Sequence, residues 1–109
     1  MITDSQEKIY QKQAEVVTAL SHWVRIAILD FLKDGPQCVC HIAKHVGSER
    51  SNVSKHLSIL VNADILDSHK DGLNVIYRLK TPCIMDFFLC IRTCLKERAK
   101  DNKNLLKSL

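Results

Sequence analysis

The sequence is poor in residues that interrupt secondary structure and in long apolar segments. It has two prolines and three glycines, and it contains no low-complexity tract, internal repeat or Pro/Gly/Ser-rich linker. A hinge between domains is therefore not indicated, and the 109 residues fit one domain over 1–109. Uninterrupted apolar runs such as 26–29 are far shorter than the roughly 20 residues that cross a bilayer, so we expect no membrane partner.

Several functional motifs are also missing. Residues 1–13 are polar and charged and lack the apolar centre of a secretory signal, so we expect a cytoplasmic location. There is no Cys-x-x-Cys motif, no glycine-rich phosphate loop and no carboxylate pair in a pocket context, so we do not expect an enzyme. Five cysteines without a signal argue against a disulfide framework and leave free thiols, a soft-metal site or redox sensing.

Helical periodicity is the main pattern in the first third of the chain. The first expected helix runs from residue 4 or 5 to about 17, and its apolar positions are sparse, as is typical of a helix that packs against a partner. The second expected helix begins at residue 19 or 22 and runs to 33. Gly35 and Pro36 end it in the order usual for a helix C-terminus.

The middle of the chain predicts a helix-turn-helix. A short helix over 38–46 ends at Gly47, residues 48–49 form the turn, and a further helix covers about 51–63. After this helix the apolar period changes from 3.6 to 2, which predicts strands over 66–69 and 73–79.

A hairpin and a last helix complete the expected fold. Asp71-Gly72 is the strongest short hairpin signal in the chain. Pro82 is suited to the first turn of a helix that runs to about residue 100, and residues 101–109 either continue this helix or fray. The sequence therefore predicts a mostly α protein with a small β-hairpin, a winged helix-turn-helix of order α-α-α-α-β-β-α, which forms a homodimer through helices in 1–17 and 82–109.

Several segments resemble the ArsR–SmtB family of metal- and metalloid-responsive repressors. The similarity covers roughly residues 15 to 98 and is carried by Ala19-Leu20, Arg25-Ile26-Ala27-Ile28-Leu29, Cys38-Val39-Cys40, Ser51-Asn52-Val53-Ser54-Lys55-His56-Leu57 with Leu60, and Tyr77-Arg78-Leu79. The Cys-Val-Cys pattern is similar to that of the arsenic-type subgroup. The resemblance implies a transcriptional repressor that binds double-stranded operator DNA as a homodimer, with two recognition helices in successive major grooves.

Polar side chains on the expected recognition helix and wing form the candidate DNA-binding site. Short hydroxyl and amide groups can bond to base edges or phosphates, and basic groups can pair with phosphates. Residues 37–109 carry twelve basic and seven acidic side chains, whereas residues 1–36 carry four and five. The candidate DNA contacts are Arg50, Ser51, Asn52, Ser54, Lys55 and His56 on the helix, with Lys70, Asn74 and Arg78 on the wing.

Cys38 and Cys40 form the first candidate metal site. A helix N-terminus stabilises a thiolate, and thiolates select soft ions. The resemblance implies binding of As(III), Sb(III) or a soft divalent metal such as Cd or Pb at this place. Two departures from the family pattern leave the site short of a local third sulfur, because His41 replaces an acidic residue and Ala43 replaces a third cysteine.

Cys83, Cys90 and Cys94 form the second candidate site. Their spacing of seven and four places the three thiols on one stripe of the last helix. The resemblance implies an interfacial metal site here, in which Cys83 and Cys94 replace histidines, Glu97 takes the last position, and Thr81 stands where a carboxylate is expected. In such a site, cysteine sulfur would replace histidine nitrogen as the ligand, and the site would favour soft ions.

Two alternatives to ion sensing stay open. Free cysteine often packs as a small buried hydrophobe, so either thiol group can be structural. Thiol-based redox or persulfide sensing by a repressor of the same fold is the second alternative. The absence of a cysteine from the second expected helix argues against the persulfide subclass.

Overall fold

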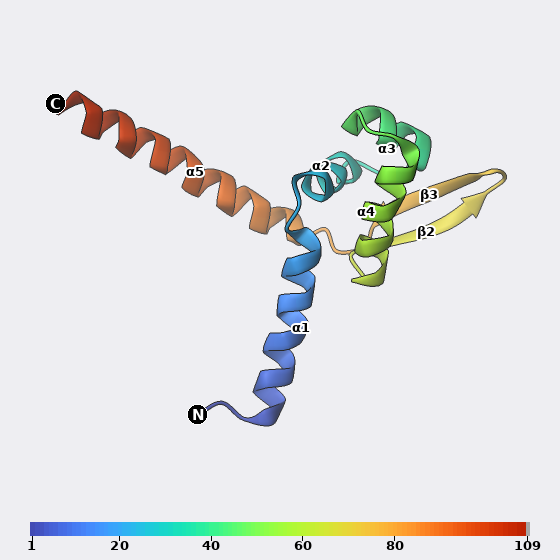
Figure 1. The fold of residues 1–109 in the computed structure, drawn as a ribbon, viewed down its shortest axis with the longest axis horizontal. Coiled ribbons are helices and arrows are strands. Elements are labelled where there is room, and N and C mark those ends of the chain that lie inside the picture. The colour runs from blue at the N-terminus through green and yellow to red at the C-terminus, as the bar shows by residue number, and fades with distance from the viewer. Residues whose placement is uncertain (109) are drawn as a thin grey trace.

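The computed structural model describes residues 1–108 and confirms a winged helix-turn-helix. Within these residues the chain forms five helices and three strands (Figure 1). Their order is α1 (Asp4–Leu20), α2 (Trp23–Leu32), β1 (Gln37–Cys38), α3 (Val39–Val46), α4 (Arg50–Asn62), β2 (Leu66–Asp71), β3 (Asn74–Leu79) and α5 (Ile84–Lys107).

The ends of the first two helices differ from the sequence-based prediction. Thr3, rather than residue 4 or 5, caps α1: its hydroxyl accepts from the backbone N–H of Gln6 at 3.2 Å, and the Gln6 side chain accepts from the Thr3 N–H at 2.8 Å. This reciprocal capping box satisfies two donors that a helix start leaves without partners. α1 continues to Leu20, and His22 caps α2 through its ring nitrogen.

The three strands form an antiparallel sheet in the order β1-β3-β2. β1 is only two residues long and was not predicted, since so short a segment has no periodicity; it exists through its pairing with β3, where Cys38 faces Ile76. The hairpin loop is Gly72-Leu73 rather than Asp71-Gly72, because Asp71 pairs with Asn74. A positive φ of 64° at Gly72 alone gives the loop the type II′ pattern, which favours glycine first.

α5 starts at Ile84, two residues after Pro82, and continues to Lys107, so the segment after residue 100 extends the helix, which is one of the two expected outcomes. No proline or glycine interrupts residues 101–107, so nothing in the local sequence ends the helix earlier. No helix within residues 1–108 is both long and apolar enough to cross a membrane.

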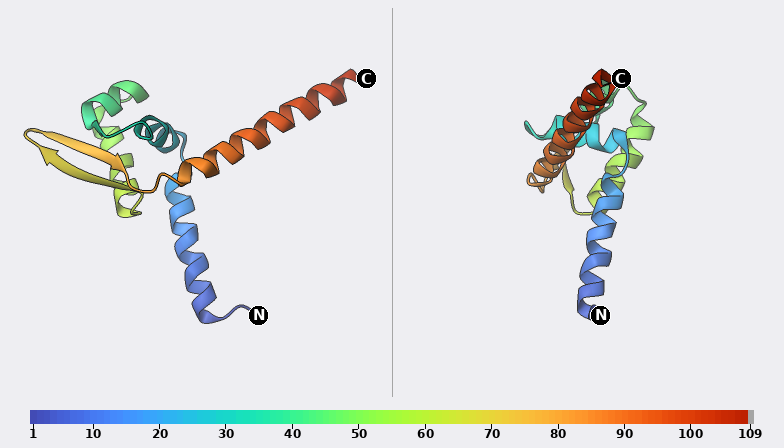
Figure 2. Two further views of the ribbon diagram at one scale, coloured as in Figure 1. Left: turned by 180° about the vertical axis from the view of Figure 1, so that it is seen from behind. Right: turned by 90° about the vertical axis from the view of Figure 1, so that its left-hand side faces the viewer.

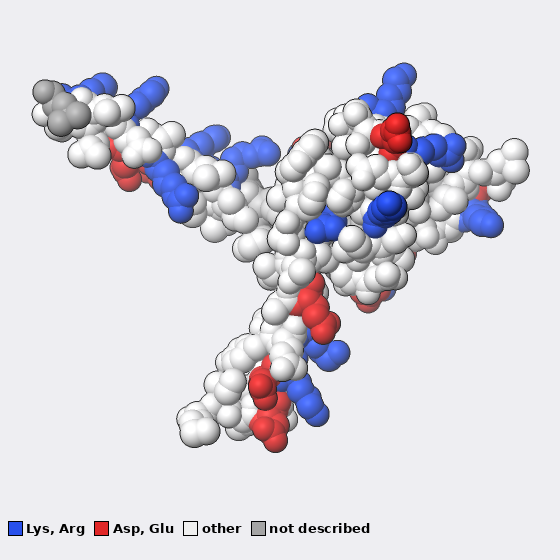
Figure 3. Space-filling view, in the orientation of Figure 1, with Lys and Arg blue, Asp and Glu red and all other residues white. Residues whose placement is uncertain are grey.

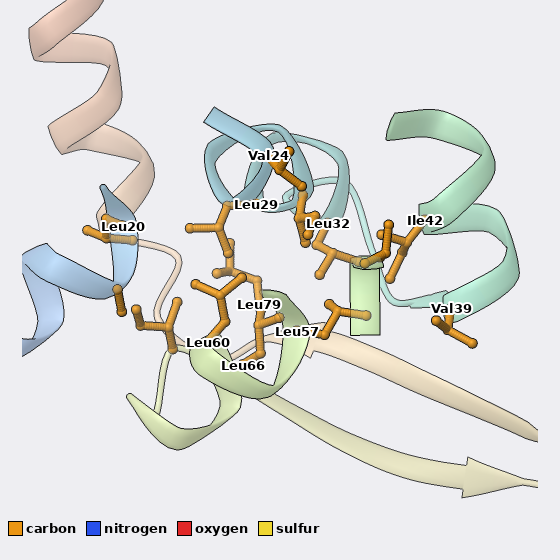
Figure 4. Close-up of a cluster of buried hydrophobic side chains, with 14 of the residues drawn as sticks. Leu20, Val24, Leu29, Leu32, Val39, Ile42, Leu57, Leu60, Leu66 and Leu79 are labelled. Atoms are coloured by element: carbon orange, nitrogen blue, oxygen red, sulfur yellow. The ribbon is translucent and has the colours of Figure 1, made fainter. Parts of the chain in front are cut away.

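The hydrophobic core lies where α2, α3, α4 and the sheet meet (Figure 4). Side chains with the least exposure come from each of these elements and point toward one another. The fully buried set is Ile28 and Leu29 of α2, Ile42 of α3, Val53, Leu57 and Leu60 of α4, and Ile65 and Leu66 at the start of β2.

α1 and α5 extend from this body as two arms, with the chain ends at their tips (Figures 1 and 2). The Cα radius of gyration is 17.6 Å, whereas a compact domain of about 100 residues has roughly 13 Å. Only Ala19 and Leu20 of α1 are buried, and no residue of the described helix α5 is. The arms therefore leave apolar side chains uncovered, among them Ile9, Tyr10 and Val17 of α1 and Phe87, Leu89, Ile91 and Leu95 of α5.

A core leucine and an exposed leucine provide a matched test of this arrangement. Leu29 is 0% exposed and Leu73 is 102% exposed. We expect Leu29→Ala to lower the free energy of unfolding by about 2–5 kcal/mol, because it removes buried apolar surface and leaves a cavity. Leu73→Ala should change it by no more than about 0.5 kcal/mol. Urea unfolding followed by circular dichroism measures both, and equal effects would contradict the assigned core.

Candidate DNA-binding interface and thiol sites

The turn between α3 and α4 sets the direction of the candidate recognition helix. Gly47 ends α3 with a φ of 78°, in the left-handed region where a side chain is strained. Its N–H donates to the Ala43 carbonyl at 2.9 Å, and the N–H of Ser48 donates to the same oxygen at 3.2 Å. The chain then extends through Glu49 and enters α4 at Arg50.

One face of α4 is buried and the opposite face is exposed. Val53, Leu57 and Leu60 are each 0% exposed and face the core. Arg50 is exposed at the first position of the helix, above the buried stripe. The exposed side carries the predicted Ser51, Asn52 and Lys55, and it continues with Ser58, Ile59 and Asn62. The last three residues were missed by the sequence reasoning, although steps of three, four and seven from Lys55 place them on the same face.

Two of the predicted contacts have local roles that affect how they are displayed. Ser51 lies inside α4 and is not its cap; Glu49 occupies the cap position and makes no side-chain capping bond. The Asn52 side-chain amide donates to the Ser48 hydroxyl at 3.1 Å. This bond orients the Asn52 amide beside the turn, and the residue itself is exposed.

His56 is only half-buried and faces α2 rather than the exposed side. Its ring centroid lies 4.4 Å from that of His22. Nη1 of Arg25 lies 3.5 Å from Nδ1 of His56, and Nε of Arg25 is buried without a hydrogen-bond partner among residues 1–108. His22 in turn accepts the Val24 N–H on Nδ1 at 3.1 Å, so one cluster joins the start of α2 to the middle of α4.

This cluster favours the uncharged form of the His56 imidazole. Arg25 can only donate, so the facing Nδ1 of His56 must accept and carries no proton. Burial lowers the pKa of His56 below its ordinary value, and the charges of His22 and Arg25 lower it further. His56 therefore lies between α4 and α2, and its contact with DNA stays a prediction.

The wing carries two ion pairs near its base. Both oxygens of Asp67 accept from Arg78, through its Nε at 3.1 Å and its Nη2. This bond lowers the pKa of the Asp67 carboxyl and raises that of the Arg78 guanidinium. Lys80 pairs with Asp64 at 2.6 Å. The predicted contact Arg78 is thus held by a neighbouring strand.

Figure 3 shows the face of the body that includes α4, where basic side chains are spread among uncharged ones and a few acidic ones. Of the predicted wing contacts, Lys70 and Asn74 are exposed near the hairpin tip. The structure therefore brings the exposed side of α4 and the wing onto one body. Ser54 is half-buried at the edge of this surface.

Cys38 and Cys40 lie where the sheet meets α3. Cys38 is half-buried, ends β1 and occupies the cap position of α3 with an extended backbone (φ −78°, ψ 157°). Cys40 is exposed in the first turn. The Gln37 carbonyl oxygen Oε1 lies 3.4 Å from Nδ1 of His41 and links the strand to the same turn.

The other three thiols are exposed on or beside α5. Cys83 precedes the helix with a helical backbone (φ −62°, ψ −18°), so the expected stripe with Cys90 and Cys94 holds. At about 1.5 Å per residue, the eleven residues from Cys83 to Cys94 span roughly 16 Å along the helix. Those two thiols of one chain therefore cannot bind one ion, whereas Cys90 and Cys94 are one turn apart.

No group of three or more His, Cys, Asp or Glu side chains within residues 1–108 is placed to hold a metal ion. Neither candidate site is therefore complete as a three-ligand site in a single chain. None of the five thiols is buried, so packing in the core of one chain does not explain them.

Sequence comparison identifies the family. Residues 24–68 match the model described as "Bacterial regulatory protein, arsR family". An uncharacterised HTH-type transcriptional regulator of Mycobacterium tuberculosis, Rv0081, is 31% identical over 104 residues, which are 94% of this chain and 91% of that protein. The chain belongs to the arsR family. Its members are transcriptional regulators that bind DNA through a winged helix-turn-helix.

Two further relatives of this arsR-family chain are repressors. The transcriptional repressor SdpR of Bacillus subtilis is 35% identical over 71 residues, covering 65% of this chain and 79% of SdpR. The arsenical resistance operon repressor of Staphylococcus aureus is 29% identical over 77 residues, covering 71% and 74%. The chain is accordingly a transcriptional repressor of this family.

Solved structures share the fold. The crystal structure of Rv0081 has a TM-score of 0.74 and 30% identity, covering 86% of this chain and 95% of Rv0081. The antimony-specific transcriptional repressor AntR has a TM-score of 0.70 and 28% identity, covering 93% and 88%. The homodimeric DNA-binding domain of Mb0332 from Mycobacterium bovis has a TM-score of 0.78 and 23% identity, covering 92% and 93%, and shows the fold alone.

The His56 environment predicts a pH dependence of stability in this arsR-family chain. Because the pKa of His56 is lower in the folded state than the ordinary 6.5, the unfolded chain binds the proton more readily. The stabilising effect is therefore complete above pH 6.5 and is lost as the pH falls through the lowered pKa. We expect His56→Gln to flatten the pH dependence of the unfolding free energy measured in urea between pH 7.5 and 5.

The matched control is Ser58→Ala, which changes an exposed, uncharged residue two positions along α4. It should shift the unfolding free energy by the same amount at every pH. A wild type and His56→Gln with parallel pH profiles would contradict a role for neutral His56.

Proposed function

We propose that this chain represses transcription as a homodimer that binds an operator through α4 and the wing and leaves it when thiolates bind As(III), Sb(III) or a soft metal ion such as Cd or Pb. The observation that carries the proposal is the position of Cys38, which both caps α3 and pairs with the wing strand β3. An ion bound there acts directly on the two elements that hold the DNA-reading surface.

The uncovered arms support a second copy of the chain as the dimer partner. An apolar cleft of about 310 Å³ lies between them, lined by Gln13, Val16, Val17, Leu20, Ile84 and Phe87. The arms leave the body on the side away from the wing, so pairing of two copies there leaves both α4 faces available (Figure 1). Two copies of one chain then bind two half-sites about one helical turn apart.

The exposed side of α4 supplies the groups for base readout. Asn52 has the side chain that pairs best with adenine, and its bond to Ser48 restricts the amide orientation. Lys55 lies next to it on the exposed side and suits a phosphate. Ser51 and Ser58 are short enough to let the helix approach the groove floor.

Two substitutions separate base readout from phosphate binding. Lys55→Ala should weaken binding to all duplexes and lower the slope of log K against log salt by about 0.9 for each phosphate that the variant no longer neutralises. Asn52→Ala should cost about 1–3 kcal/mol on the selected sequence only, since it removes a hydrogen-bonding group for a base edge. Fluorescence anisotropy with a duplex chosen by the protein from a random pool measures both.

Lys100→Ala, on the exposed outer half of α5, is the control for Lys55→Ala because it removes the same charge far from α4. It should leave affinity and salt slope close to wild type. Equal effects of the two lysine variants would remove α4 from the proposed interface.

Coupling between the ion and DNA follows from local geometry. Cys38 has an extended backbone at the cap position and Cys40 lies in the first turn of α3, so we infer that an ion held by both thiolates changes the geometry where β1 enters α3. That change shifts α3, which supports α4, and the pairing of Cys38 with Ile76 in β3. The bound ion then favours a conformation with low DNA affinity. By linkage, bound DNA lowers the affinity of the protein for the ion by the same factor.

The ligand class follows from the donor set. Two thiolates bind soft ions better than hard ones, and a water, hydroxide or external thiol fills the remaining position of As(III) or Sb(III). The Staphylococcus aureus arsenical resistance operon repressor and the antimony-specific AntR support this class by similarity. Cys83, Cys90, Cys94 and Glu97 are the competing location, where thiols from two copies would have to share an ion.

Arsenite release of DNA distinguishes the two locations. We expect arsenite to dissociate the wild type from its selected duplex, and to dissociate the Cys83→Ser/Cys90→Ser/Cys94→Ser variant equally well. Cys38→Ser/Cys40→Ser should bind DNA normally and resist arsenite, because the coupling thiolates are gone. Arsenic-edge absorption of the wild-type complex should count two protein sulfurs.

The opposite pattern, with only the α5 variant resistant, would move the sensor to α5. Cd(II) and Pb(II) titrations extend the same assay to divalent ions. If no ion releases DNA but peroxide or persulfide does, with a Cys–Cys crosslink in the mass spectrum, the chain is a redox-sensing repressor instead.

A further inference from the structure

The tip of the wing is apolar. Leu73 is 102% exposed, the highest value among the large hydrophobic residues after Met1. It occupies the second position of the two-residue loop between the paired Asp71 and Asn74. The loop thus places a leucine at the outermost point of the hairpin, where it contributes nothing to the core.

The position of Leu73 argues against contact with a second copy through the arms. Figure 1 and the left view of Figure 2 both show β2 and β3 extending beyond α4, away from α1 and α5. The apolar cleft between α1 and α5 lies on the other side of the body. The wing tip therefore lies where it can contact the same binding partner as the exposed side of α4.

Two basic side chains on or beside the wing are held in ion pairs. Arg78 is paired with Asp67, and Lys80 is paired with Asp64. Lys70 is exposed, with the carboxylate of Asp71 beside it in the sequence. Lys70 can therefore attract a phosphate beside the tip, whereas Leu73 itself offers apolar contact.

The length of the hairpin matches the geometry of a duplex. Six-residue strands reach roughly 20 Å at about 3.4 Å per residue. From a major groove held by α4, the neighbouring minor groove is about half a helical turn away, roughly 17 Å. The hairpin is long enough to cross the intervening backbone.

We propose that Leu73 contacts DNA in the minor groove and makes the wing prefer A·T over G·C pairs there; the proposal rests on the DNA-binding function proposed above. In the minor groove a G·C pair adds the guanine N2 amino donor, which A·T pairs lack. A leucine side chain cannot accept that hydrogen bond and displaces the water that does. An A·T segment presents no such donor and lets the side chain be buried.

Inosine separates this contact from every major-groove effect. An I·C pair keeps the O6 and N7 acceptors of guanine in the major groove but lacks the N2 amino group. The selected duplex is therefore prepared in three forms that differ only about half a turn outside each α4 half-site: A·T, I·C and G·C. Anisotropy then gives the dissociation constant of the full chain for each.

We expect the wild type to bind the A·T and I·C duplexes roughly fivefold more tightly than the G·C duplex, as partial burial of one leucine implies. Leu73→Ala should bind all three with nearly the same constant, close to that of the wild type on G·C. Its thermal midpoint should equal that of the wild type, because the side chain is fully exposed.

Lys70→Ala is the control from the same tip. It should weaken all three complexes by one factor and reduce the salt slope, while the fivefold preference remains. Retention of the preference by Leu73→Ala, or equal wild-type binding to I·C and G·C, overturns the proposal. A wild type that selects no duplex overturns the DNA-binding function itself, and the Leu73 proposal with it.

Discussion

The burial of one stripe of α4 is the constraint on which the rest of the structure depends. Val53, Leu57 and Leu60 are completely removed from solvent against α2, α3 and the sheet. A helix with a single apolar stripe has one way to bury it, so the rotation of α4 and the direction of its polar face are fixed together. Ile65 and Leu66 join the same core immediately after α4. The wing therefore takes its orientation from the packing that orients the helix, and the two reading elements share one rigid support.

Most of the body could be predicted from the sequence because its signals are local. The apolar spacing of α4, Gly47 at the turn and the change of period near Leu66 all act within a few residues. The errors lie where the structure depends on contacts between residues that are far apart in the sequence. β1 exists only through its pairing with β3, and the loop is Gly72-Leu73 because the register joins Asp71 to Asn74.

In the candidate site, too, local patterns could be predicted from the sequence, whereas contacts between distant residues could not. The polar face of α4 was expected, and only its second half was overlooked, although its spacing was visible in the sequence. The pairing of Arg78 with Asp67 depends on strand register, and the contact of His56 with His22 depends on how α4 packs against α2. Periodicity reports which face of a helix is buried, but it does not report which polar group at the border meets another. The contacts of Arg78 and His56 therefore could not be predicted before the packing was known.

β3 connects the thiol positions to the DNA-reading surface. It is the central strand of the sheet, with β1 and Cys38 on one side and the hairpin partner β2 on the other. Its C-terminal end leads through Thr81 to Cys83 and α5, so both thiol groups border the same strand. In the proposed function, an ion at Cys38 would change the pairing along β3, whereas an ion on α5 would change the anchor at its end. Because Arg78 and Lys80 are neutralised by their own carboxylates, movement of β3 alters where the wing lies far more than how much charge it presents. Under that proposal, the fold would convert a small change in backbone geometry at a thiolate into a poorer fit to a DNA groove.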